Sequence, residues 1–207
     1  MKAELQNLYE TERNRLLELK DLMGDYSSPV FGEGDAFSTI VLVGEAPGAN
    51  EAEQGRVFVG KAGEQLNAML ALANLKREEI FITNAVKFRP IKRTKTSVSN
   101  RTPTIAEINA SNYVLQKELE LIKPHFVITL GNTALSAVIK ATKANIKFTT
   151  LKEMQGKPRK LRAFDFRFTL YPVYHPASVI YNRELQPALD ESLVRIPEIL
   201  RGLGYRV

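Results

Sequence analysis

Four short apolar runs, separated by segments with helical spacing, constrain the fold of this chain more than any other feature. Each run is rich in β-branched or aromatic residues and has the length of a buried strand. The runs are residues 39–43, 80–84, 126–130 and about 168–173. Strands that alternate with helices pair in parallel and are covered by helices on both faces. The sequence therefore predicts an α/β protein with three α/β/α layers and a central four-stranded parallel sheet, joined by right-handed crossovers.

The apolar positions outside these runs recur at the spacing of amphipathic helices. The helix predicted at 105–122 begins with a capping box, because Thr104 precedes it and Glu107 can bond back to the Thr104 amide. We expect a single domain over residues 1–207, with the N-terminal helix and lead-in loop of residues 1–37 packed on it. The predicted helices are residues 2–23, about 63–75, 105–122, 132–141 and roughly 185–202.

Composition excludes several kinds of site. The chain has no cysteine, so disulfides, thiolate metal sites and cysteine-held iron–sulfur clusters are excluded. Two histidines are too few for a histidine-rich zinc site, and we expect no metal and no cofactor. No apolar run approaches the roughly 18 residues of a membrane span, and the acidic N-terminal segment does not fit a signal peptide. We therefore expect a cytoplasmic monomer that does not bind membranes.

The positive charge is concentrated in two stretches. The net charge is +6, which is common in proteins that bind a polyanion, although a modest excess also aids solubility. Residues 87–101 carry only basic charges, and residues 140–167 carry a large excess of Lys and Arg. Both stretches are candidates for contacts with nucleic-acid phosphates; the alternative is that they are two solvated loops.

Polar and glycine residues follow the carboxyl ends of the four runs. The first run ends in Gly44-Glu45-Ala46-Pro47-Gly48, and the others deliver Asn84, Gly131-Asn132 and His175. Because parallel strands end at the same edge of a sheet, we expect these groups to converge in one crevice.

Each of these residues, taken singly, has a structural explanation. Asn84 is equally compatible with a turn cap, His175 with a structural histidine, and the downstream Phe58 with a core residue. A different interpretation makes residues 44–48 a phosphate-binding loop, but the chain lacks the Walker A Gly-Lys-Ser/Thr and a regular GxGxxG. Their convergence at one edge favours a binding site.

Five motifs in this order resemble the family 4 uracil-DNA glycosylases, a branch of the uracil-DNA glycosylase superfamily. They span nearly the whole chain, and the upstream VFGEGDAF at 30–37 resembles the family's lead-in to the first strand. The resemblance implies that the chain flips uracil out of DNA and hydrolyses its N-glycosidic bond as a monofunctional repair enzyme. The motifs are GEAPG at 44–48, GRVFVGKAGEQLN at 55–67, FITNAVKFRP at 81–90, LIKPHFVITLGNTAL at 121–135 and YHPASVI at 174–180.

The resemblance also implies roles for individual residues. Phe58 would stack on the flipped base, and Asn84 would read the uracil edge by donating to O4 and accepting from N3–H. His175 would donate a hydrogen bond to O2 as negative charge develops on the leaving base. Glu45 is a third catalytic candidate, and Glu51 would have a supporting role. The pocket around water and sugar would be shaped by Gly44, Ala46, Pro47 and Gly48.

The expected partner is uracil-containing DNA, single- and double-stranded, at the nucleoid. The family's serine and arginine after His-Pro are replaced by Ala177 and Tyr181, while Ser178 offers a substitute hydroxyl. An apolar wedge is expected at Val179 or Ile180. The predicted DNA-binding residues are Lys87, Arg89, Lys92, Arg93, Ala177, Ser178 and Val179.

Family 4 enzymes usually hold a [4Fe–4S] cluster with four cysteines. This chain has apolar residues at the corresponding positions. The four positions fall near Leu16 and Leu19, at Phe88 and near Ala110, which suggests that packing replaces the cluster. Ala52 stands where an acid is common. Ala46 stands where other branches of the superfamily carry a water-activating Asp, so Glu45, Glu51 or backbone groups must activate the water here.

Two questions stay open at the level of sequence. The departures at Ala52, Ala177 and Tyr181 are also compatible with a non-catalytic or altered-specificity member that binds DNA or a replication or repair partner. Asn84 favours uracil, but hypoxanthine or xanthine as a further substrate is left open.

Overall fold

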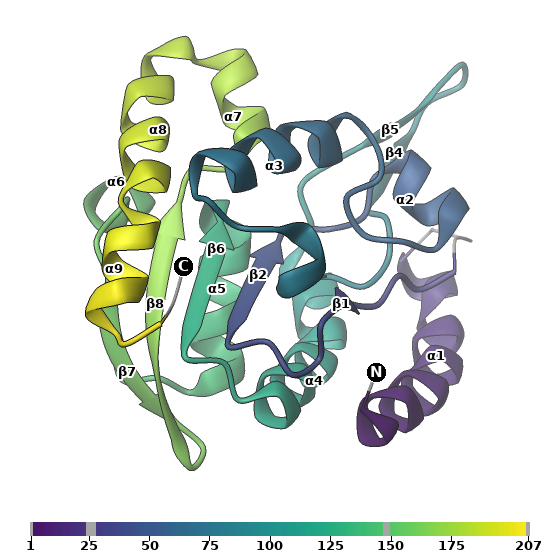
Figure 1. The fold of residues 1–207 in the computed structure, drawn as a ribbon. Coiled ribbons are helices and arrows are strands. Elements are labelled where there is room, and N and C mark those ends of the chain that lie inside the picture. The colour runs from purple at the N-terminus through teal and green to yellow at the C-terminus, as the bar shows by residue number, and fades with distance from the viewer. Residues whose placement is uncertain (1, 24–27, 147–149, 206–207) are drawn as a thin grey trace.

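The chain folds around one twisted, mostly parallel sheet (Figure 1). The computed structural model describes residues 2–23, 28–146 and 150–205. In spatial order the sheet contains β1 (Glu33–Gly34), β3 (Phe81–Asn84), β2 (Ile40–Gly44), β6 (Phe126–Leu130), β8 (Phe166–Val173) and β7 (Arg159–Ala163). A separate hairpin is formed by β4 (Ile91–Arg93) and β5 (Val98–Asn100).

The predicted four-stranded parallel sheet is confirmed as the centre of this larger one. Strands β3, β2, β6 and β8 pair in parallel, whereas β1 and β7 add antiparallel edges. The sequence did not reveal either edge strand. β1 has two residues inside a glycine-rich loop, and β7 is mostly basic and exposed, so neither has the apolar pattern of a strand.

Helices cover both faces of the sheet, which confirms the three layers. The 3₁₀ turns are η1 (Arg77–Glu79) and η2 (Arg183–Leu185). The helices are α1 (Ala3–Met23), α2 (Ala49–Gln54), α3 (Lys61–Leu72), α4 (Ile105–Ile122), α5 (Gly131–Thr142), α6 (Leu151–Met154), α7 (Pro176–Tyr181), α8 (Gln186–Val194) and α9 (Ile196–Gly202).

The core is divided into two clusters by the sheet. Alternate strand residues face opposite clusters, since Val41 and Val43 pack with α1, α4 and α5 while Ile40 and Leu42 pack with α3, α8 and α9. The α1 helix packs along α4 and contributes the fully buried Leu5 to the first cluster. The clusters fix the sheet from both sides and hold the strand ends rigidly.

Helix boundaries follow local chemistry. The predicted capping box is present: the Glu107 amide donates to Thr104 Oγ1 at 3.3 Å, and the Thr104 amide donates to Glu107 Oε2 at 2.7 Å. The single helix predicted over 185–202 is two helices, α8 and α9, because Pro197 cannot supply the amide that would continue α8. No helix within the described ranges is both long and apolar enough to cross a membrane.

Candidate functional site

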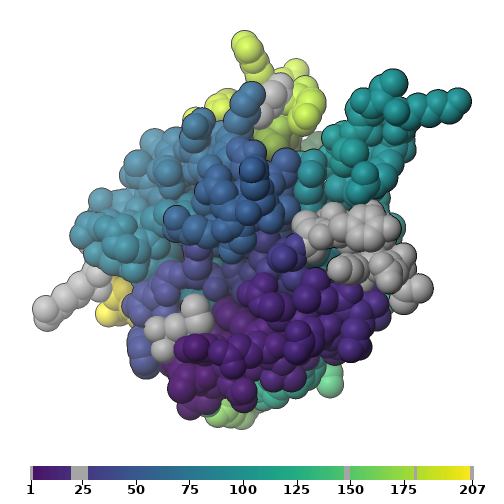
Figure 2. Space-filling view, turned by 90° about the vertical axis from the view of Figure 1, so that its right-hand side faces the viewer, coloured from purple at the N-terminus to yellow at the C-terminus, as the bar shows by residue number. Residues whose placement is uncertain are grey.

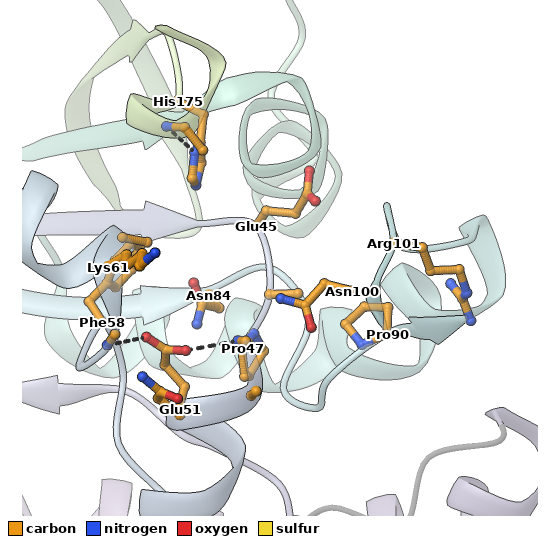
Figure 3. Close-up of a pocket in the computed structure, with 17 residues that line it drawn as sticks. Glu45, Pro47, Glu51, Phe58, Lys61, Asn84, Pro90, Asn100, Arg101 and His175 are labelled. Atoms are coloured by element: carbon orange, nitrogen blue, oxygen red, sulfur yellow. Dashed lines mark hydrogen bonds between the residues drawn. The ribbon is translucent and has the colours of Figure 1, made fainter. Parts of the chain in front are cut away.

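A cavity of about 340 Å³ lies where the parallel strands end, as the sequence predicts. Figure 3 shows His175 pointing into it from one side and Asn84, Phe58 and Glu51 grouped on the other. Residues from the loop after β2 form one wall, and the base of the β4–β5 hairpin forms another. The lining residues that the sequence predicts are Glu45, Ala46, Pro47, Gly48, Glu51, Phe58, Asn84, His175 and Ala177.

Asn84 lines this cavity and carries a buried acceptor without a partner among the described residues. The residue ends β3 and is 2% exposed, and its Oδ1 accepts no hydrogen bond from any residue that the structure describes. A buried carbonyl oxygen without a partner costs about 1–3 kcal/mol. This oxygen is therefore an acceptor that the described part of the fold leaves unpaired.

Gly44 leaves room for that side chain. It pairs with Asn84 in the parallel ladder between β2 and β3. A Cβ atom at Gly44 would lie 2.4 Å from Asn84 Oδ1 and 2.4 Å from Phe58 Cζ. Gly44 does not line the cavity itself, but any side chain there would displace two residues that do.

Phe58 is held in one orientation by its backbone. Its φ of 52° is in the left-handed region, which a phenylalanine rarely adopts. Gly63 in α3 allows this geometry, because a Cβ there would lie 2.0 Å from the Phe58 carbonyl oxygen. The ring is 7% exposed and belongs to the second core cluster, with one side on the cavity. Phe58 is thus both a core residue and a wall of the site.

Glu51 braces the loops on either side of the cavity. Its carboxylate accepts hydrogen bonds from the amides of Val59 at 3.0 Å and Gly60 at 2.8 Å. Both of those bonds are to Oε1, and the other carboxylate oxygen, Oε2, accepts a hydrogen bond from the amide of Gly48 at 3.1 Å. This side chain connects the loop after β2 to the Phe58 loop, and both of its oxygens are occupied by backbone amides; its supporting role in the reaction stays a prediction.

His175 faces the cavity as a neutral imidazole. Its Nδ1 accepts a hydrogen bond from the Ala177 amide at 3.2 Å, which places the proton of the neutral ring on Nε2. Burial lowers the pKa of His175 from 6.5 to about 4. At neutral pH the ring is therefore a hydrogen-bond donor without a charge.

Glu45 lies between two cavities. It is half-buried at the end of β2, and Thr133 at the start of α5 donates a hydrogen bond to its Oε2 at 2.6 Å. A neighbouring cavity of about 600 Å³ shares Glu45 and His175 with the first and continues past Thr133. The remaining part of this second cavity includes the predicted residue Ser178 and a basic residue, Lys152.

Two of the predicted DNA contacts are wrong. Lys87 is fully buried, with its ammonium 2.7 Å from Glu118 Oε2, so it cannot reach a phosphate. Val179 is 9% exposed and packs in the second core cluster, so it is not a protruding wedge. The side chain of Ile180, the other wedge candidate, lies outside the described residues.

The other basic residues of 87–101 lie on or beside the projecting hairpin. Figure 2 shows this hairpin standing clear of the body of the molecule. Lys92 and Arg93 are exposed on β4. Arg89 at its base donates from Nε to Asn100 Oδ1 at 2.7 Å, and Asn100 lines the cavity. The hairpin therefore connects exposed charge directly to the rim of the site.

The second basic stretch does not form one surface. Lys152 lies in the cavity next to the site, but Lys160 and Arg167 line a cavity with His125 and Tyr205 elsewhere on the molecule. Residues 147–149 of this stretch lie outside the described residues. The β7–β8 part of this candidate stretch thus lies away from the site, and phosphate contacts by residues 140–167 stay a prediction.

The positions of the family's cluster ligands do not fit a metal cluster. Leu16 and Phe88 are buried in the first core cluster, and Leu19 packs against it. Ala110 contributes a carbonyl oxygen that accepts from Arg15 at 2.8 Å. Across the described ranges no group of His, Asp and Glu could hold a metal ion, and the sequence has no cysteine. Leu16, Leu19 and Phe88 therefore contribute to apolar packing in the first core cluster.

Sequence reasoning missed several lining residues. Lys61 and Arg101 line the cavity. The sequence offered a signal for each, because Lys61 lies inside the motif at 55–67 and Arg101 inside the basic stretch 87–101. Arg101 is held by Glu107 through two contacts of 2.7 Å, so it anchors the hairpin to α4. Asn100 lies in the same basic stretch and Thr133 in another quoted motif, but only the fold shows that Asn100 lines the cavity and that Thr133 holds Glu45 from the neighbouring one.

Comparisons with known proteins agree with this geometry. The model of the "Uracil DNA glycosylase superfamily" matches residues 31–196. A "Type-4 uracil-DNA glycosylase" of Saccharolobus solfataricus is 36% identical over 82% of this chain and 74% of its own length. The corresponding protein of Archaeoglobus fulgidus is 34% identical over 86% of this chain and 85% of its own length. Another, of Sulfurisphaera tokodaii, is 34% identical over 84% of this chain and 75% of its own length.

Proposed function

The chain belongs to the uracil DNA glycosylase superfamily, and from this premise we propose that it excises uracil from DNA by hydrolysing the N-glycosidic bond. The observation that carries the proposal is the unpaired, buried Oδ1 of Asn84 in a cavity that also receives the neutral imidazole of His175. The product is an abasic site, as base excision repair requires.

We propose that Asn84 selects the base. Its Oδ1 accepts from N3–H of uracil, while the amide NH₂ donates to O4. Cytosine has an unprotonated N3 and an amino group at these positions, so it would leave the buried acceptor unpaired. A site of this kind rejects the wrong ligand by as much as about 10⁴-fold. Phe58, which lines the cavity, stacks on the flipped base.

His175 stabilises the leaving group. When the bond between C1′ and N1 breaks, its electron pair goes to the base, and negative charge develops on O2. The Nε2–H of His175 donates a hydrogen bond there, because Nδ1 is already bound to the Ala177 amide. A neutral donor avoids the desolvation cost of a buried cation, and the lowered pKa keeps it neutral.

Water then adds to C1′ and gives up a proton to solvent, and the released base anion takes up a proton, so the products are the abasic sugar and neutral uracil. We propose that Glu45 orients this water. Thr133 holds the Glu45 carboxylate by its Oε2, and Glu45 borders the cavity beside His175. Glu51 is a poorer candidate, since both of its oxygens accept backbone amides. This reaction needs no cofactor.

DNA contacts are proposed on both sides of the cavity. The exposed Lys92 and Arg93 on the hairpin and Arg89 at its base would contact phosphates on one side. Ala177 and the hydroxyl of Ser178, at the start of α7, would contact the strand on the other side. Because these contacts flank an open cavity, we propose that one domain, acting as a monomer, accepts single- and double-stranded DNA.

A labelled oligonucleotide with one deoxyuridine tests the proposal. We expect that incubation with the enzyme, followed by alkali, cleaves the labelled strand at the abasic site. The cleavage should occur in single strands and in duplexes alike. Tight binding of uracil-containing DNA without any product, by folded protein in large excess, would instead support a binding module. The replacement of a cation by Tyr181, which is 90% exposed, is the observation that favours this second candidate.

A further inference from the structure

The ion pair between Lys87 and Glu118 is buried directly below the base-reading end of β3. Both side chains have no exposed surface, and Lys87 Nζ lies 2.7 Å from Glu118 Oε2. Desolvation lowers the pKa of Lys87, while the nearby carboxylate opposes that shift. Such a pair adds little net stability over apolar residues of the same size. Stability alone therefore does not account for it.

The ammonium of Lys87 donates all three of its hydrogens to buried groups around the ion pair. It donates to Glu118, to Thr83 Oγ1 at 2.6 Å and to the backbone carbonyl of Asn84 at 2.8 Å. The last contact fixes the peptide group that carries the base-reading side chain. Asn84 itself has no hydrogen bond at Oδ1, so its orientation depends on its backbone and on packing.

Glu118 connects this network to distant parts of the fold. Its Oε2 accepts from Thr83 Oγ1 at 2.9 Å, and its Oε1 accepts from Tyr9 in α1 at 2.8 Å and from the Gly32 amide at 3.3 Å. The ring of Tyr9 stacks on Phe31 at 4.5 Å between centroids. Helices α1 and α4 and the lead-in loop therefore converge on the support of Asn84.

We propose that Lys87 is a positioning residue, which through its hydrogen bond to the Asn84 carbonyl and its ion pair with Glu118 holds the Asn84 amide in the geometry that reads uracil. This inference rests on the proposed function of Asn84. It gives the buried network a role in base selection and catalysis, and it explains why a lysine in a basic stretch faces inward.

The test uses a charge-balanced double variant, Lys87→Met/Glu118→Gln, in the full chain. Glutamine keeps an acceptor for Tyr9, and removal of both charges leaves no uncompensated ion. The Asn84 carbonyl loses its donor, and the contacts of Lys87 to Thr83 Oγ1 and to residue 118 are lost with it. Leu135→Ala, in the same core cluster, is the control for general destabilisation. Glu118→Gln alone is the second variant, which weakens the anchor of Lys87 but keeps its ammonium.

We expect the single-turnover excision rate of the double variant to fall about 10- to 100-fold, since small displacements of a reading group have effects of this size. The enzyme concentration at half-maximal rate should change less than about twofold, because the DNA contacts lie elsewhere. Glu118→Gln should show a smaller loss of rate. Leu135→Ala should lower the melting temperature and leave the rate unchanged well below it.

A second readout does not depend on activity. The side-chain amide resonances of Asn84 in a ¹⁵N–¹H spectrum should shift in the double variant and in Glu118→Gln, and not in Leu135→Ala. A folded double variant with wild-type rate, unshifted Asn84 resonances, or equal loss in Leu135→Ala would each overturn the inference. If the wild-type protein itself excises no uracil, the proposed function fails, and the Asn84 resonances still test the positioning.

Discussion

Asn84 is the residue on which base selection depends. Replacement by alanine removes the acceptor and donor that face the cavity, so we expect Asn84→Ala to lower uracil excision at least about 100-fold. Its thermal stability should stay close to wild type, since Oδ1 has no hydrogen bond to lose among the described residues. Excision at the wild-type rate would contradict the assigned role; single-turnover kinetics and a melting curve measure the two effects.

Gly44 offers a separate test of the same pocket. In Gly44→Ala the added methyl would meet Asn84 Oδ1 and Phe58 Cζ, each at 2.4 Å. We expect the excision rate to fall about tenfold or more while DNA binding persists, because only the base-reading groups move. Gly202→Ala is the matched control, since nothing lies within 4 Å of a Cβ at that position. Full activity of Gly44→Ala would mean that the pocket is looser than the structure indicates.

The imidazole of His175 sets the acid limb of the pH profile. Its pKa of about 4 keeps the ring neutral above about pH 5, so the single-turnover rate should be level from there to pH 8 and decline below. A midpoint near 6.5 would contradict a neutral donor. Folding stability also falls between pH 6.5 and 4, because the unfolded chain binds this proton more readily. Circular dichroism at each pH separates the two effects.

At the scale of elements, the β4–β5 hairpin is the main candidate for DNA contact outside the cavity. We expect Lys92→Ala/Lys95→Ala to weaken binding to duplex DNA and to reduce the slope of log K against log salt by about 0.9 for each phosphate that is no longer neutralised. Both lysines are exposed. The matched control is Lys160→Ala/Arg167→Ala, which removes two cations away from the site. Equal effects of the two double variants would indicate unspecific electrostatics.

The elements also show where sequence reasoning reached its limit. The four parallel strands and the capped helix α4 follow from local patterns, namely apolar runs and the pair Thr104 and Glu107. The β7 strand and the inward side chain of Lys87 do not, because each is determined by pairing or burial between distant segments. Charge in the sequence marks a basic stretch, but it does not say which of its side chains faces water.

At the scale of the whole molecule, the convergence of strand ends made the site predictable. Glu45, Asn84 and His175 come from β2, from β3 and from the turn after β8, and a parallel sheet brings these ends to one edge. Asn100 reaches the same cavity from the hairpin, whereas Thr133 lines the neighbouring cavity from α5 and holds Glu45, and no strand-end pattern marks either residue. The same architecture packs Leu16 and Phe88, from segments far apart in the sequence, in one core cluster.

The most direct test compares excision of uracil and cytosine from otherwise identical oligonucleotides, with hypoxanthine and xanthine measured alongside to establish the base range. We predict rapid release of uracil by the wild-type protein and a rate for cytosine lower by up to about 10⁴-fold, because only uracil donates from N3 to Asn84 Oδ1. Comparable rates for the two bases, or no release of uracil by folded protein in excess, would contradict it.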